Sequence, residues 1–116
     1  MDDDFKPIEF TGLRNARFET KNGTTYSIGH DDILYRNNRP VGTLIAIVGL
    51  SEEHVLEARE YEQQHTTEGM ANLYQMMNDH GQPPGENMWL VLRYRINQTM
   101  RQKVTNRVIK IIHNSV

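Results

Sequence analysis

The chain contains no cysteine among its 116 residues. This absence excludes a disulfide framework, a thiolate zinc site and a cysteine nucleophile. The longest nearly apolar run, residues 41–50, is too short for a membrane-spanning helix, which needs about 20 residues. The acidic start, Met1-Asp2-Asp3-Asp4, is not followed by the apolar stretch of a secretory signal. We therefore expect a cytoplasmic protein without membrane contact.

Catalytic and cofactor motifs are also missing. The sequence has no Gly-x-Ser-x-Gly element, no glycine-rich phosphate loop and no pair of histidines at the spacing that places two imidazoles on one helix face. We therefore predict no catalytic residue, no cofactor and no metal site. One alternative is an enzyme without a recognisable motif that uses His30, Asp31 and Asp32, although these residue types are also typical of a polar turn between strands.

The formal net charge is only −2, which excludes a uniformly basic coat for nucleic acid. The total hides an uneven distribution along the chain. Residues 1–50 hold six bases and seven acids, residues 51–84 hold one base and seven acids, and residues 85–116 hold six bases and one acid. An acidic middle is thus followed by a basic end.

The first fifty residues have the pattern of two β-hairpins. Asn22-Gly23 is a strong hairpin signal, and a three-residue loop of residues 21–23 places Phe18 opposite Tyr26 on one apolar face. A second hairpin runs from residues 33–36 through a turn at 37–40 into residues 41–48, of which 44–48 lack polar alternation. Both faces of that strand should therefore be covered, either by a second layer or by a dimer.

The middle of the chain predicts helices. Ser51 is a suitable N-cap, and Gly81 followed by Pro83 is a suitable end. A single helix of this length would protrude from a compact domain, so we predict two helices with the second capped by Thr66 or Thr67. Met70, Leu73, Tyr74 and Met77 form its apolar face; Met76 falls beside that face and would mark an interface if exposed.

The C-terminal segment is ambiguous. Alternation over residues 88–96 indicates a strand, whereas apolar residues recur every four positions from Leu92 to Val108, as in a helix. We predict a strand at 88–96 and a helix over about 98–112, with one long helix as the alternative. The overall prediction is a single α+β domain over residues 1–116: a β-rich part (1–50), an acidic helical part (51–81) and a basic strand–helix part (85–116). Two to three helices would pack on an antiparallel sheet of four to five strands.

The opposed charges suggest the function. We predict a small non-enzymatic binding or regulatory module that acts through protein contacts and forms a homo-oligomer. Its ten asparagines and six glutamines would suit an accessory protein of a phage or mobile element. The predicted interface residues are Met76, Glu53, Glu57 and Glu60. The alternative is a protein whose basic segment binds nucleic acid or another acidic partner. The residues of that surface would be Arg93, Arg95, Arg101, Lys103, Arg107 and Lys110.

Overall fold

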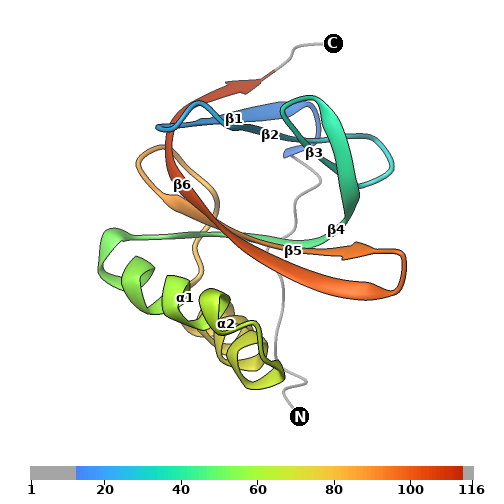
Figure 1. Ribbon diagram of the computed structural model, residues 1–116. Coiled ribbons are helices and arrows are strands. Elements are labelled where there is room, and N and C mark those ends of the chain that lie inside the picture. Colours follow the sequence, from blue (N-terminus) through green and yellow to red (C-terminus); the bar gives the residue numbers. More distant parts are fainter. Residues whose placement is uncertain (1–12, 114–116) are drawn as a thin grey trace.

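The computed structural model describes residues 13–113, so the acidic start of the chain lies outside the described part. These described residues form six antiparallel strands and two helices (Figure 1). In chain order these are β1 (Ala16–Thr20), β2 (Thr25–Ile28), β3 (Ile33–Arg36), β4 (Arg39–Leu50), α1 (Glu52–Gln64), α2 (Thr67–His80), β5 (Trp89–Ile96) and β6 (Thr99–His113). This confirms the α+β class, with more strands than the predicted four to five.

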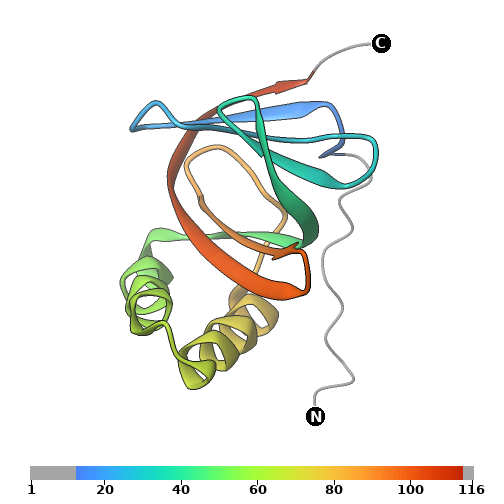
Figure 2. The ribbon, with the colours of Figure 1, turned by 45° about the vertical axis from the view of Figure 1, so that its right-hand side comes forward.

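The six strands form a closed barrel in which each strand pairs with its neighbours in the sequence. The barrel closes where β6 pairs with β1, from Ala16 opposite His113 to Thr20 opposite Val108. Helices α1 and α2 are inserted between β4 and β5 and lie against the outside of the barrel (Figure 2). Between residues 13 and 113, neither helix is long and apolar enough to span a bilayer.

Both predicted hairpins are present, as β1–β2 and β3–β4; the turn of the second covers residues 37–38 and is shorter than the predicted 37–40. Phe18 pairs with Tyr26, and the Thr20 amide donates to the Thr24 carbonyl at 2.9 Å, which leaves residues 21–23 as the predicted three-residue loop. Gly23 takes a φ of +88°, a conformation that glycine adopts without steric cost. In the second hairpin, Asn37 and Asn38 both have positive φ, as a tight two-residue turn between right-twisted strands requires.

Two apolar clusters lie on opposite sides of the barrel wall. The inner cluster contains side chains from all six strands, including Phe18, Leu34 and Leu92. The outer cluster joins β4, β5 and β6 to the helices, with Val48, Val91 and Leu73 among its members. Strand β4 therefore has both faces covered, as its unbroken apolar sequence predicts, and the covering layer is the helical pair of the same chain.

The prediction of two helices is confirmed. Thr66 is the N-cap of α2, and its hydroxyl accepts a hydrogen bond from the Gly69 amide at 2.9 Å. The α2 residues facing the barrel are Gly69, Leu73, Met76 and Met77. Met76 would mark an interface only if it were exposed. It is only 5% exposed and belongs to the outer apolar cluster. The apolar face is rotated slightly from the predicted one.

The predicted helix over residues 98–112 is wrong, because β6 occupies this range as a strand of fifteen residues. Two register shifts explain why its alternation is hidden in the sequence. One extra residue of β6 lies between Val104 and Arg107 opposite β5, and another is Ile109 opposite β1. Each β-bulge shifts the inward and outward positions by one, which breaks the two-residue period.

Candidate functional site

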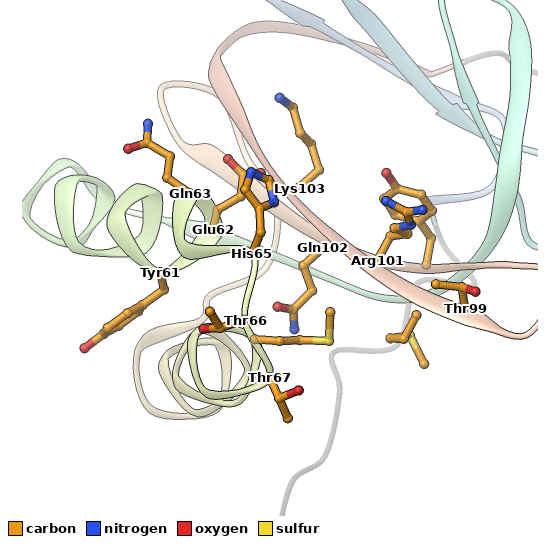
Figure 3. Close-up of a pocket in the computed structure, with 13 residues that line it drawn as sticks. Tyr61, Glu62, Gln63, His65, Thr66, Thr67, Thr99, Arg101, Gln102 and Lys103 are labelled. Atoms are coloured by element: carbon orange, nitrogen blue, oxygen red, sulfur yellow. The ribbon is translucent and has the colours of Figure 1, made fainter.

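A cleft of about 530 Å³ separates the α1–α2 connection from β6 (Figure 3). One wall consists of the end of α1, the connection and the first turn of α2, and it includes Glu62, His65 and Met70. The other wall consists of Tyr94 from β5 and five consecutive residues of β6: Thr99, Met100, Arg101, Gln102 and Lys103.

The five consecutive lining residues show which part of β6 the cleft touches. Successive side chains of a strand point to opposite faces of the sheet. A cavity against one face would therefore contact only alternate residues. Because residues 99–103 all line the cleft, it runs along the edge of β6, where the backbone itself is accessible.

Among residues 13–113, no strand pairs with this edge of β6. Residues 99–107 pair with β5 on one side, while β1 begins to pair with β6 only at Val108. Alternate residues of an antiparallel strand direct their N–H and C=O groups away from the neighbouring strand. Since the Val104 amide points away from β5, the same orientation applies to Gln102 and Met100. Their outward groups have no hydrogen-bond partner within residues 13–113.

Side chains of α1 form hydrogen bonds with backbone groups on the next part of the same edge. The Val104 amide donates to the Glu62 carboxylate at 2.6 Å, and the Arg59 guanidinium donates to the Thr105 carbonyl at 2.9 Å. Beyond them, the Lys21 amide donates to the Arg107 carbonyl at 2.8 Å. The unpaired edge is thus confined to the stretch that faces the cleft.

The basic residues of this hairpin lie on two faces. Arg101 is paired with Tyr94 and Lys103 with Leu92, so these two cations share the face that continues the barrel interior. No carboxylate of the described chain lies within 4.0 Å of either cation. Arg95 lies on the opposite face, is exposed, and likewise has no carboxylate partner there. The cleft therefore contains positive charge that its own walls do not neutralise by direct contact.

Arg93 is held between β5 and α2 by contacts with its neighbours. Its guanidinium lies 4.3 Å from the centre of the Tyr74 ring, a cation–π contact between β5 and α2. Burial lowers the pKa of Arg93, an effect that Tyr74 opposes, and the group remains charged at neutral pH. The Gln102 amide, oriented to satisfy both neighbours, accepts from Arg93 Nη1 at 2.6 Å and donates to the Met70 carbonyl at 3.2 Å. These contacts fix the floor of the cleft.

The other predicted basic residues lie elsewhere on β6. Arg107 donates to the Asn87 side chain at 2.9 Å, and Lys110 lies opposite Glu19 on the part of β6 that pairs with β1. The six bases thus do not form one continuous surface. The predicted strand at 88–96, which holds Arg93 and Arg95, is confirmed by β5. The predicted helix for the other four bases is wrong, because β6 is the second strand of the same hairpin.

The acidic helix lies beside the basic strand in the same subunit but forms no ion pair with it among residues 13–113. Glu62 contacts a backbone amide of β6, and Glu57 accepts from the Tyr61 hydroxyl at 3.1 Å. Glu53 and Glu60, predicted interface residues together with Glu57, are exposed. Their role in an interface stays a prediction.

The residues of the alternative enzyme prediction lie in the turn between β2 and β3. Asp32 has a φ of +61°, and its amide donates to the Gly29 carbonyl. Its carboxylate pairs with Arg14 at 2.6 Å, while His30 and Asp31 are exposed. None of the three lines the cleft described above or a second, smaller one beside Tyr35. The turn interpretation therefore accounts for them.

The histidines of the described segment do not gather into a metal site. His54 and His80 stack with ring centres 4.0 Å apart, which joins the start of α1 to the end of α2. His65 ends α1 in a left-handed conformation at the rim of the cleft. No group of three or more His, Asp or Glu side chains in residues 13–113 could hold a metal ion.

Comparison with known proteins gives no relative from which a function could be transferred. No protein-family model, curated protein or solved structure matches the chain.

Sequence reasoning missed the helical wall of the cleft and the free strand edge. It named Arg101 and Lys103 as binding residues of the alternative function, and Thr66 or Thr67 as a cap. It could not bring them together, because their proximity depends on β6 being a strand. A signal was present, since residues 104–112 are rich in valine, threonine and isoleucine, which favour strands.

Proposed function

We propose that this protein is a non-enzymatic binding module whose partner is another protein, and that the cleft along residues 99–103 of β6 receives an extended segment of it. The observation that carries the proposal is the unpaired edge. The outward N–H and C=O groups of Met100 and Gln102 match those of another peptide backbone, and addition of a strand to an exposed sheet edge is a common mode of peptide recognition.

The length of the free edge limits the length of the peptide that can pair with it. Five strand residues span about 17 Å at 3.4 Å per residue. Glu62 and Arg59 occupy the edge beyond them, so an added strand would end at that point. This arrangement limits uncontrolled edge-to-edge aggregation while leaving one short segment available.

Arg95, Arg101 and Lys103, which have no carboxylate partner among residues 13–113, and Tyr94 nearby favour nucleic acid as a second candidate. Two features make it the weaker one. Glu62 lies in the cleft, and α1 presents the exposed carboxylates of Glu53, Glu57 and Glu60. A continuous polyanion along this surface would meet both signs of charge.

The experiment is a selection of peptides from a random displayed library on the immobilised full chain. Selected peptides are then measured against Met100→Pro and the matched control Met100→Leu. Proline removes the outward amide of Met100 without removing a hydrogen bond to β5. We expect binding to survive in Met100→Leu and to fall at least about tenfold in Met100→Pro, the equivalent of one lost hydrogen bond.

A second measurement covers the case in which Met100→Pro does not fold. In the unaltered protein, a bound peptide should slow hydrogen exchange at the amides of Met100 and Gln102. Failure to select any peptide, or selected peptides that protect neither amide, would contradict the proposal. Fluorescence anisotropy with labelled oligothymidine tests the second candidate, which requires binding that weakens steeply between low and high salt.

A further inference from the structure

We infer that the segment bound at this edge is acidic, with two carboxylates separated by one apolar or neutral residue. This inference rests on the proposed function and specifies its ligand. It follows from the positions of the two cleft cations relative to the free edge.

Arg101 and Lys103 are two residues apart and lie on the same face of β6. A strand added to β6 would place its alternate side chains on that face. The outward hydrogen bonds of β6 belong to Met100 and Gln102, so Arg101 and Lys103 occupy the positions without hydrogen bonds to an antiparallel added strand. Cross-strand side chains are closer at those positions, with Cα atoms about 4.5 Å apart. Two residues of the ligand at positions i and i+2 therefore face the two cations directly.

The charge of the cleft selects carboxylates at these two positions. Within the described chain neither Arg101 nor Lys103 has a carboxylate within 4.0 Å, and the one carboxylate that lines the cleft, Glu62, accepts from the Val104 amide. An acidic ligand would thus form new ion pairs without displacing existing ones. Opposite charges directly across two strands stabilise the pairing.

The intervening ligand residue faces the other side of the sheet. There the cleft is lined by Met100 and by Met70 of α2, and Gln102 is held by Arg93 and the Met70 carbonyl. Gln102 has its side-chain hydrogen bonds satisfied, and the two methionines offer flexible apolar contacts. The preferred ligand is therefore an acidic–apolar–acidic segment in extended conformation.

The test uses fluorescein-labelled peptides and the full chain. The probe has the core Thr-Glu-Val-Glu-Thr. One control, Thr-Gln-Val-Gln-Thr, removes the charges, and a second, Thr-Glu-Glu-Val-Thr, has the same composition with adjacent carboxylates. We expect the probe to bind about tenfold more tightly than either control, the combined effect of two cross-strand ion pairs.

Matched protein variants locate the effect. Arg101→Glu with Lys103→Glu should reduce probe binding at least about tenfold, whereas Lys21→Glu with Lys110→Glu, which changes the net charge equally at exposed positions outside the cleft, should change it less than about threefold. If the charge-reversed pair does not fold, Arg101→Gln with Lys103→Gln replaces it, with the same direction expected.

The outcomes separate the two proposals. Equal binding of the three peptides, all lost in Met100→Pro, would overturn the acidic preference and leave the protein-binding function in place. Absence of any ligand that depends on the β6 edge would overturn the proposed function itself. Binding of a peptide of residues 1–8 would identify the start of this chain as the occupant. Light scattering that shows a dimer dissociated by Met100→Pro would identify a second copy of the chain as the occupant. Either result would overturn the assignment to a separate partner.

Discussion

Replacing Glu62 with alanine should destabilise the protein by exposing the edge of β6 that α1 covers. The carboxylate accepts the Val104 amide at 2.6 Å in a partly buried position. Hydrogen bonds to charged groups contribute about 1.5–3 kcal/mol, and partial exposure places this one near the lower end. We therefore expect the free energy of unfolding to fall by about 1.5 kcal/mol. For a chain of this size, that corresponds to a decrease in Tm of roughly 6 °C.

Urea denaturation followed by circular dichroism measures this loss. The matched control is Glu60→Ala, an exposed position on the same helix, which corrects for the change in helix propensity and should alter stability by less than about 0.5 kcal/mol. Hydrogen exchange gives a local reading, because the Val104 amide should exchange about tenfold faster in Glu62→Ala. Equal stability of the two variants, with an unchanged exchange rate at Val104, would refute the idea that α1 protects this edge.

Three further predictions concern the packing and the pH response. Leu73 is fully buried between α2 and the barrel, so Leu73→Ala should cost about 2–5 kcal/mol in denaturant titration, and a cost below about 1 kcal/mol would show that the helices are not docked as described. A Cβ atom at Gly81 would overlap the Met77 carbonyl oxygen and lie 2.9 Å from Val48, so Gly81→Ala should lower Tm, whereas an unchanged Tm would contradict this close approach. Burial raises the pKa of Tyr26, an effect that Arg36 opposes, so the folded state retains the phenolic proton at a pH where the unfolded chain releases it. This contribution to stability is complete below about pH 10 and is lost as the pH rises from there through the higher folded pKa. The free energy of unfolding should therefore decline less across this range in Tyr26→Phe than in the unaltered protein. Equal declines would contradict the assignment.

The N-terminal half of the fold could be predicted because its signals are local. Asn22-Gly23 determines a turn, and the pairing of Phe18 with Tyr26 follows from the requirement for one apolar face. The unbroken apolar run of β4 implied a cover on both sides, and Ser51, Thr66 and Gly81 marked the helix boundaries. Each inference needed only a few neighbouring residues.

The C-terminal half could not be predicted in the same way because β6 is bent by two bulges. Its residues alternate between faces in three short stretches, so Val104 faces the helices while Val108 faces the barrel interior. Four-residue spacing of this kind resembles a helical period. The cleft was hidden for a related reason, since the α1–α2 connection faces residues 99–103 only when β6 forms a strand beside β5.

The pairing of Leu50 with Trp89 also has a consequence for the order of folding. The helical insertion leaves and re-enters the barrel at one rung of the β4–β5 ladder. Closing a loop over residues 51–88 without structure would carry a substantial entropy cost. Helices α1 and α2 shorten this loop, and the backbone bridge between Gly49 and Gln82 returns the chain to β4 directly after α2.

The β1–β6 seam has no such aid, because it joins Ala16 to His113 across nearly the whole described chain. We therefore expect the local hairpins to form first, the helical pair to bring β4 and β5 together next, and the seam to close last. Until the seam closes, residues 108–113 of β6 and their partner strand β1 both expose unpaired edges. The slowest step of folding would then also be the one most vulnerable to misassembly between chains.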